Sequence, residues 1–204
     1  MEMKNRIEQT LEKLLETYNY SGELQDAMRY SLLAGGKRVR PILMLEHLSC
    51  YKEPTEEDYI LASALECIHS YSLIHDDLPA MDDDTLRRGK PTNHVVYGEA
   101  TAILAGDALL NMALEASINL SCKDAKYIEG ARIIAHRAGS KGMIYGQLLD
   151  MEKNSRDLDA VVKMVRYKTG ALFSAAIECA MSVLDLLEEQ KNIHFELADK
   201  IGIA

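Results

Sequence analysis

Apolar side chains recur at helical spacing through almost the whole sequence, whereas the apolar–polar alternation of strands is nearly absent. The breaks between the periodic segments carry helix-ending residues, among them Gly35-Gly36, Pro54-Thr55, Gly89-Lys90-Pro91 and Gly139. Because the connections are short, consecutive helices are expected to pack as neighbours. The pattern predicts an all-α fold with helices at residues 3–19, 22–34, 39–50, 55–78, 98–120, 124–140, 142–152, 157–169, 170–190 and 191–204.

The 204 residues are 48% hydrophobic, which is enough to bury one sizeable core. The sequence has no repeat, low-complexity tract or linker, so residues 1–204 are predicted to form a single domain. The last segment, ELADKIGIA, is an amphipathic pattern without a cap or polar tail. A helix ending there would leave its apolar face and last carbonyls poorly covered, so we expect the fold to continue in a longer parent chain.

The net charge of -9 argues against general nucleic-acid binding, because no broad basic surface is available to neutralise phosphates. No uncharged apolar run is as long as a membrane span, and the N-terminal segment lacks the apolar stretch of a signal peptide. Cys50, Cys67, Cys122 and Cys179 are scattered in apolar helical contexts without a CxxC pair. They are interpreted as reduced core thiols, which predicts a cytoplasmic protein.

The segment HDDLPAMDDDTLRRGK, residues 75–90, crowds five aspartates together and follows them with two arginines. On an unbroken helix Asp82 would lie about 240° around from Asp76, so the two could not share an ion. Pro79 must end or bulge the helix, and a bulge could return Asp82 to the face of Asp76. We hypothesise that Asp76 and Asp82 ligate Mg²⁺ with support from Asp77, because hard oxygen ligands suit that ion. The alternative is an acidic helix end on the surface.

Two basic clusters accompany these acids. Arg87 and Arg88 offer planar forks that match phosphate oxygens, so acids, metal and arginines together predict a diphosphate site. In AGGKRVRP, residues 34–41, two glycines end one helix and Pro41 suits the first turn of the next. Backbone amides around Gly35 and Gly36 can then approach an anion closely. The three basic side chains expected to project from this bend are Lys37, Arg38 and Arg40.

Other polar residues are weaker candidates. His69 lies two turns before Asp76 on the same helical face, and a core histidine with a satisfied hydrogen bond is the equal alternative. Lys168 and Thr169 in KTG supply an ammonium and a hydroxyl between two predicted helices. Gln147 and Asp150 in GQLLD lie one turn apart on one face, where ordinary pairing between helices would also explain them.

With GGKRVRP, ECIHSYSLIHDDLPAMDDDTLRRGKPTNH, GQLLDM and YKTGALF in this order, the sequence resembles the trans-prenyltransferase (polyprenyl diphosphate synthase) family, bacterial farnesyl diphosphate synthases above all. The resemblance covers most of the chain, and the long second block is highly specific. It implies an isoprenoid-synthase-type helical bundle around a central substrate cavity. It also implies a homodimer that condenses isopentenyl diphosphate with dimethylallyl or geranyl diphosphate, using three Mg²⁺ ions and releasing diphosphate.

The resemblance also assigns roles to residues. Asp76 and Asp82 match metal ligands of the first aspartate-rich motif, in its form with two extra residues. Arg87 matches the arginine that binds the allylic diphosphate, while Lys168 and Thr169 match the pair beside the allylic carbon. Gln147 and Asp150 match the GQxxD of the family. The residues that match the binders of isopentenyl diphosphate are Lys37, Arg40, His69 and Arg88.

Product length is predicted from the helix preceding Asp76, along which the prenyl tail should run. Tyr71 lies five residues upstream of Asp76, about 7.5 Å along that helix, where its ring and the adjacent Ser72 would stop the tail after a few isoprene units. In the family, an aromatic residue here together with the two-residue insertion accompanies farnesyl-length products. Geranyl or geranylgeranyl diphosphate remain alternative products.

One departure from the family pattern matters. The second aspartate-rich motif, with the lysine beyond it, should follow shortly after IGIA and does not occur in this sequence. We therefore predict the function of the parent protein, whereas turnover by these 204 residues alone is an open question.

Three alternative functions differ from this prediction. An HD-type metal phosphohydrolase is suggested by His75-Asp76 with His47, His69 and Asp107 elsewhere in the sequence. It would need several histidines to converge on the metal, and it leaves the arginine pair and both other motifs unexplained. A truncated or accessory subunit that pairs with a complete synthase is favoured by the abrupt C-terminus. A terpene cyclase is disfavoured because no NDxxSxxxE-type motif occurs.

Overall fold

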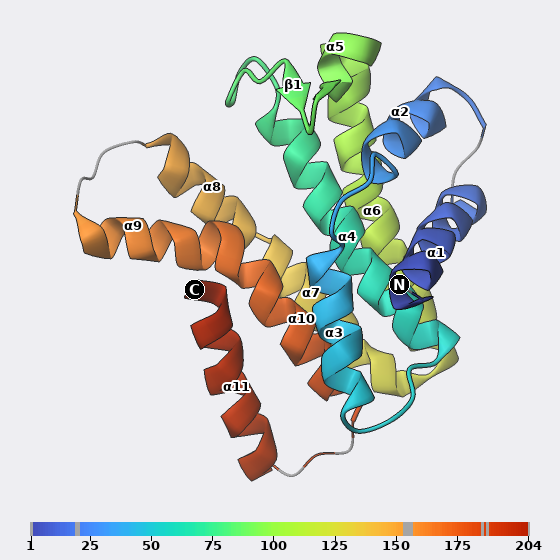
Figure 1. Cartoon of the computed structure of the whole chain (residues 1–204), viewed down its shortest axis with the longest axis vertical. Helices are drawn as coiled ribbons and strands as arrows, with labels where there is room; N and C mark the ends of the chain where they lie inside the picture. The colour runs from blue at the N-terminus through green and yellow to red at the C-terminus, as the bar shows by residue number, and fades with distance from the viewer. Residues whose placement is uncertain (1, 19–20, 153–156, 185, 187, 204) are drawn as a thin grey trace.

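The computed structural model of the 204-residue chain describes residues 2–18, 21–152, 157–184, 186 and 188–203. Within these ranges the chain folds into helices joined by short connections (Figure 1), which confirms the all-α prediction. The elements are α1 (Glu2–Tyr18), α2 (Glu23–Leu32), α3 (Val39–Ser49), α4 (Glu56–Asp76), β1 (Leu86–Arg87), β2 (Lys90–Pro91), α5 (Asn93–Tyr97), α6 (Glu99–Lys123), η1 (Ala125–Tyr127), α7 (Ile128–Ala138), α8 (Met143–Met151), α9 (Leu158–Val165), η2 (Arg166–Gly170), α10 (Ala171–Ser182) and α11 (Glu188–Ile203).

Helix α4 runs through the middle of the molecule beside α6 (Figure 1). It is apolar on several sides, and Leu61, Leu65 and Ile68 are fully buried, which is typical of a core helix. Its N-terminus is fixed by a capping box, in which Thr55 accepts from the backbone N–H of Asp58 while the Asp58 carboxylate accepts from that of Thr55. The helix therefore begins at a defined point and delivers its last residue, Asp76, to a defined place.

Small residues let α6 approach α4 closely. Ala102, Ala105 and Ala113 are fully buried on the inner face of α6. A Cβ added to Gly106 would lie 2.2 Å from Nε2 of His75 on α4, so only glycine leaves room for that ring. The sequence of α6 thereby sets the position of the last turn of α4.

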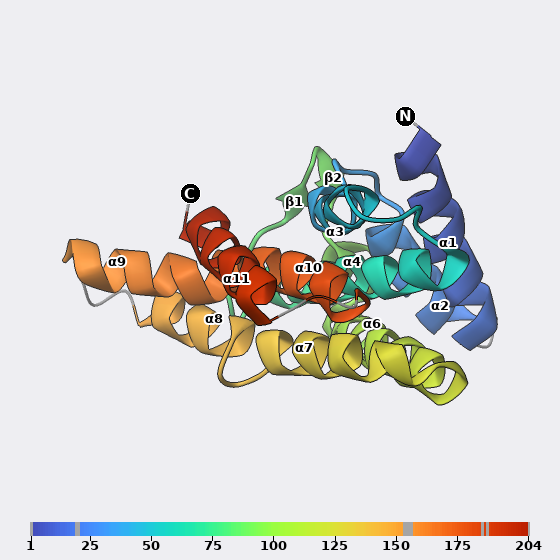
Figure 2. The ribbon, with the colours of Figure 1, turned by 90° about the horizontal axis from the view of Figure 1, so that it is seen from below.

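The remaining helices surround this pair. In Figure 1, α1 and α2 lie on one side of the molecule and α8 and α9 project from the other, an arrangement that the rotated view in Figure 2 also shows. Helix α10 packs against α3, α7 and α11. The helices that flank the end of α4 therefore come from both halves of the chain.

Some sequence expectations were wrong at the level of elements. The predicted helix 170–190 ends at Ser182, whose hydroxyl donates to the carbonyl oxygen of Cys179 at 2.8 Å and competes with continued helix. The hairpin β1–β2 and helix α5 were not predicted, because segments of two to five residues are too short to show a period. Residues 124–140 form η1 and α7 instead of one helix.

The predicted core thiols are only partly confirmed. Cys67 and Cys179 are buried, and burial raises the pKa of both thiols. Cys50 and Cys122 are exposed, because each lies at the C-terminal end of a helix and faces away from the core. A cytoplasmic location stays a prediction.

Within the described residues, helix α6 is long and apolar enough, by length and composition, to cross a membrane, which the sequence analysis did not expect. The core helix of a globular protein passes the same test. Because the inner face of α6 is fully buried against α4, we interpret it as a core helix.

Candidate active site

Helix α4 ends at Asp76, three residues before Pro79, as the sequence predicts. The chain then folds back on itself. The backbone N–H of Asp82 donates to the carbonyl oxygen of Asp76 at 2.9 Å, and that of Met81 to Leu78 at 2.8 Å. A bond between residues six apart does not occur in a continuous α-helix. The break around Pro79 therefore brings Asp82 next to Asp76, as predicted.

The carboxylate of Asp76 lies in a partly buried, charge-rich position. Burial raises its pKa to about 6, Lys168 and Arg87 oppose the rise, and Asp82 and Asp77 add to it. Negative charge at this position is thus only partly compensated by the protein. A divalent cation would stabilise the ionised form.

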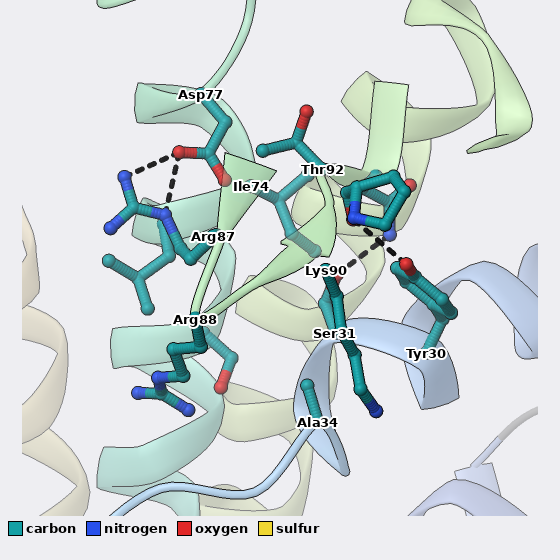
Figure 3. Close-up of a pocket in the computed structure, with 13 residues that line it drawn as sticks. Tyr30, Ser31, Ala34, Ile74, Asp77, Arg87, Arg88, Lys90 and Thr92 are labelled. Atoms are coloured by element: carbon teal, nitrogen blue, oxygen red, sulfur yellow. Dashed lines mark hydrogen bonds and ion pairs between the residues drawn. The ribbon is translucent and has the colours of Figure 1, made fainter. Parts of the chain in front are cut away.

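Asp77 is almost fully buried and is paired with Arg87 (Figure 3). The Nε of Arg87 donates to Oδ1 of Asp77 at 2.7 Å, and its Nη2 lies 2.5 Å from the same oxygen. Burial raises the pKa of Asp77, and the hydrogen bond from Arg87 opposes that rise. Asp77 therefore orients Arg87, and the support of a metal ion that the sequence predicts for Asp77 stays a prediction.

Arg88 lies below the Asp77–Arg87 pair in Figure 3 and extends away from Asp77. Its guanidinium donates to the carbonyl oxygen of Gly35. A Cβ on Gly36, whose φ is +133°, would lie 2.6 Å from Nη1 of Arg88. The glycine pair therefore provides both a strained backbone and the space into which Arg88 fits.

The two arginines are carried by the hairpin β1–β2, in which Arg87 pairs with Lys90. Arg88 and Gly89 at its tip have φ of 53° and 78°, as a two-residue type I′ turn requires. The hairpin is held against α2, since the hydroxyl of Tyr30 donates to the carbonyl oxygen of Pro91 at 2.8 Å. Nδ2 of Asn93 donates to Ser31 Oγ at 2.8 Å. Both contacts border a pocket of about 40 Å³ (Figure 3).

A larger cavity of about 570 Å³ lies beside Asp76. It is formed by α3, α4, α6, α8 and η2, and it is open to solvent. Its polar lining includes Arg40, His69, Asp76, Gln147, Lys168 and Thr169, and its apolar lining includes Leu110, Met143, Ile144, Leu148 and Met151. A ligand with an anionic head and an apolar tail fits this composition.

Cations surround the inner part of the cavity. Burial, together with the positive charges of Arg40 and Arg88, lowers the pKa of His69 to about 3, so this imidazole is neutral. The guanidinium of Arg40 lies 4.7 Å from the centre of the Phe173 ring. Burial lowers the pKa of Arg40, and its Nε has no hydrogen-bond partner in the described part of the chain. An anion bound here would supply the missing acceptor.

Lys168 and Thr169 lie in the π-helical turn η2, a geometry that is frequent at functional sites. Lys168 Nζ donates to Oδ2 of Asp150 at 2.5 Å. Helices α8 and η2 touch at Gly146, where an added Cβ would lie 2.0 Å from the backbone nitrogen of Lys168. The glycine of GQLLD thus allows the close approach that puts Lys168 into the cavity.

Tyr71 and Ser72 line the cavity on the α4 side. The Tyr71 ring packs edge-on against His75 with ring centres 5.7 Å apart, and the Ser72 hydroxyl donates to the carbonyl oxygen of His69 at 2.9 Å. Burial raises the pKa of Tyr71 to about 12, and its hydroxyl has no partner among the residues described. An aromatic wall therefore stands one and a half turns below Asp76.

Comparison with known proteins agrees with this fold and site. The family model described as Polyprenyl synthetase matches residues 21–204. The chain belongs to the polyprenyl synthetase family. It is 45% identical over 188 residues to the farnesyl diphosphate synthase of Micrococcus luteus, a match that covers 89% of this chain and 65% of that protein. It is 41% identical to the geranylgeranyl diphosphate synthase of Cyanophora paradoxa, covering 100% of this chain and 69% of that protein. The chain thus spans about two thirds of these relatives.

Solved structures show the same architecture. The crystal structure of a geranyltransferase from Legionella pneumophila superposes with a TM-score of 0.92 at 35% identity, covering 99% of this chain and 74% of that one. This likeness places the chain in the all-α fold of its family and confirms the fold class inferred from the resemblance.

Within this polyprenyl synthetase fold, most predicted site residues are brought together. Arg40, His69, Gln147, Lys168 and Thr169 line one cavity with Asp76. Asp150 reaches that group through its ion pair with Lys168, whereas Arg87 and Arg88 line the smaller pocket and Gly36 packs against Arg88. Lys37 is exposed and lines neither cavity described above. The roles of all these residues stay predictions.

One basic residue of the second cluster was placed wrongly. Arg38 was expected to project from the bend, but it is 2% exposed and ion-paired with Glu8 and Glu66. The pairing partners lie 30 and 28 residues away in the sequence, so no local pattern indicates them.

The HD-type alternative is also wrong, because its histidines do not form one metal site in the described residues. His47 packs against His194 with ring centres 4.8 Å apart, whereas Nε2 of His75 lies 3.1 Å from the carbonyl oxygen of Ile103 and 3.8 Å from Asp107. Across the described ranges, no group of three or more His, Cys, Asp or Glu side chains is arranged to hold a metal ion.

A magnesium ion still fits the acidic turn. Mg²⁺ keeps several waters and is commonly bound through one or two carboxylates plus substrate phosphates, so it does not need three protein ligands. Asp76 and Asp82 supply carboxylate oxygens at the end of α4, and their charges repel each other. These two residues would hold the ion together with a diphosphate.

Proposed function

We propose that this chain carries out Mg²⁺-dependent prenyl transfer, in which isopentenyl diphosphate condenses with dimethylallyl or geranyl diphosphate to give farnesyl diphosphate and diphosphate. The supporting observation is the single cavity that joins Asp76, at the acidic end of α4, to Arg40 and Lys168 and to apolar walls. The family match and the farnesyl diphosphate synthase relatives support the same chemistry.

Groups in the cavity and in the adjoining acidic turn and hairpin have tasks in this proposed reaction. Ionising an allylic diphosphate separates charge, and Arg87, held by Asp77, would bind the departing diphosphate. Magnesium held by Asp76 and Asp82 would neutralise part of the charge on that diphosphate. The apolar walls from α8 and α6 would limit the contact of the allylic cation with water once substrates fill the cavity. Arg40, whose Nε has no partner among the described residues, and neutral His69 would bind the second diphosphate.

The direct test is a product assay. The chain is incubated with labelled isopentenyl diphosphate, geranyl diphosphate and MgCl₂, and organic-extractable prenyl product is compared with free phosphate. We expect labelled farnesyl diphosphate, and none when the metal is chelated. Free phosphate without prenyl product would contradict the proposal. Binding of both substrates without turnover would instead favour the alternative of an accessory subunit.

Product length is proposed to depend on Tyr71. In Tyr71→Ala the aromatic wall against His75 is removed, so the cavity deepens along α4 and products longer than farnesyl diphosphate are expected to dominate. Chromatography of the dephosphorylated products measures this. Tyr71→Phe is the matched control, because it keeps the ring and removes only a hydroxyl without a partner in the described chain. An identical distribution in all three proteins would remove Tyr71 as the limit.

Dimerisation is proposed for the outer face of α6. Ile103, Leu104 and Ile118 are 43%, 57% and 57% exposed on that face, and burying apolar residues of this kind favours association. Light scattering should give twice the mass of one chain, and Leu104→Glu should shift the protein towards the monomer. A monomeric mass for the unchanged chain would contradict this.

A further inference from the structure

The side chain of Arg38 is buried at the start of α3, although its sequence neighbours Lys37 and Val39 are exposed. Its guanidinium uses all three nitrogens. Nε and Nη2 donate to the two carboxylate oxygens of Glu8 at 2.8 and 3.0 Å, and Nη1 donates to Glu66 at 2.8 Å. Nη2 also donates to the carbonyl oxygen of Leu32 at 2.7 Å. The interactions of this one side chain therefore fix three different parts of the fold.

These partners come from elements that surround the 33–40 bend. Glu8 lies on α1, Leu32 is the last residue of α2 and Glu66 lies on α4. The bond to Leu32 closes the bend on itself, because it joins the residue before the bend to a residue near its end. Lys37, with Gly35 and Gly36 before it, is thus held inside a closed loop.

Glu66 also lies close to the second arginine of this cluster. Burial lowers the pKa of Arg40, and the charge of Glu66 opposes that effect. Glu66 is buried on α4, three residues before His69, which lines the cavity. One buried carboxylate therefore compensates both Arg38 and Arg40.

Stability alone does not account for this cluster. Buried ion pairs contribute little net stability compared with apolar residues of similar volume, but they fix one geometry. Arg38 also has a left-handed backbone with φ of 51°, which an arginine adopts only when its surroundings impose it. Both features indicate that Arg38 is needed to hold the surrounding residues in one fixed geometry.

We propose that Arg38 is a positioning residue, which with Glu8 and Glu66 holds the 33–40 bend so that Lys37 and Arg40 face one bound diphosphate. Helix α1 then takes part in the site through Glu8, although it lies outside the residues matched by the family model. The identity of the ligand, isopentenyl diphosphate, rests on the proposed function. The positioning role rests on the contacts of Arg38.

Calorimetry with isopentenyl diphosphate tests the proposal on the full chain. Arg38→Met should weaken binding about tenfold, because the anion-binding side chains lose their fixed positions. Binding of geranyl diphosphate with Mg²⁺ should weaken much less, since Arg38 is bonded to Glu8, Glu66 and Leu32 in the described part of the chain, whereas Arg87 is held separately by Asp77. Arg137→Met is the matched control, because it breaks an ion pair with Glu178 between α7 and α10, away from the cavity beside Asp76. Equal affinities for isopentenyl diphosphate in the unchanged chain, Arg38→Met and Arg137→Met would overturn the proposal.

A double variant separates positioning from a general loss of structure. If Arg38 acts by positioning Lys37 and Arg40, the effect of Arg38→Met on affinity should be smaller in a Lys37→Ala background than in the unchanged chain, whereas independent effects would multiply. Should Arg38→Met fail to fold, Glu8→Gln replaces it, because Glu8 is partly exposed and its loss is milder. About threefold weaker binding is expected for Glu8→Gln, and unchanged binding would overturn the proposal.

Cleavage at Lys37 by a lysine-specific protease provides a readout without any ligand. The bend should be cut faster in Arg38→Met and Glu8→Gln than in the unchanged chain or Arg137→Met, while cleavage at Lys90 should not change. Equal cleavage rates at Lys37 would contradict the positioning role. If the unchanged chain fails to bind isopentenyl diphosphate, the proposed function is wrong in its substrate, and the cleavage rates still decide the role of Arg38.

Discussion

Replacing Asp76 with alanine is expected to abolish Mg²⁺-dependent diphosphate binding and to lower prenyl transfer about a thousandfold, because metal stabilisation of developing charge contributes several kcal/mol. Asp76 ends α4 and borders the large cavity, and burial raises its pKa to about 6. The protein provides only partial compensation for this carboxylate. Its removal should therefore weaken Mg²⁺ binding without lowering the free energy of unfolding.

The measurement is calorimetric titration of inorganic diphosphate with and without MgCl₂, together with thermal unfolding. Asp83→Asn is the matched control, since it removes one charge from the same loop at a residue with φ of 55°, a conformation that asparagine tolerates well. Mg²⁺ should strengthen diphosphate binding in the control and not in Asp76→Ala. Equal enhancement in both variants would refute the role given to Asp76.

Replacing Arg87 with methionine is expected to produce the second-largest loss. Turnover should fall about a hundredfold, the usual effect of removing one group that stabilises charge in the transition state. The variant should also lose about 2 kcal/mol of unfolding free energy, because the buried Asp77 carboxylate is left unpaired. The loss is reduced by the one-third exposure of the Arg87 side chain.

A companion variant distinguishes these two effects. Asp77→Asn combined with Arg87→Met removes the unpaired charge, so the unfolding free energy measured in urea should recover while turnover stays low. If turnover recovers together with stability, Arg87 serves the fold and has no direct part in the reaction. The proposed role in binding the allylic diphosphate would then be wrong.

The sequence predicts the helical architecture because long amphipathic and apolar segments carry a strong period. It also predicts the break after Asp76, because a proline removes a backbone donor and crowds the preceding turn. Both predictions depend only on local chemistry. The proximity of Asp82 to Asp76 follows directly from that break.

The arrangement of the basic cluster could not be predicted in the same way. Arg38 and Arg40 are two residues apart and chemically alike, yet one is enclosed by carboxylates and the other lines the cavity. The difference arises from Glu8 and Glu66, which only the packing of α1 and α4 brings to Arg38. Long-range ion pairs leave no periodic signal in a sequence.

Two further features depend on close packing. Gly146 allows α8 to touch η2, and the π-helical turn at Arg166–Gly170 presents Lys168 to the cavity. The motifs GQLLD and KTG marked these positions, but neither shows how closely the backbones approach. The hairpin tip Arg88-Gly89 did carry a usable signal, because a residue followed by glycine is common in two-residue turns.

The most direct test of the central claim is a crystal structure of the chain with Mn²⁺ and inorganic diphosphate, in which anomalous scattering locates the metal. The account predicts a peak bonded to carboxylate oxygens of Asp76 and Asp82 and to the diphosphate, with Arg87 on the same anion. A bound metal and diphosphate elsewhere, with the carboxylates of Asp76 and Asp82 directed apart into solvent, would contradict it.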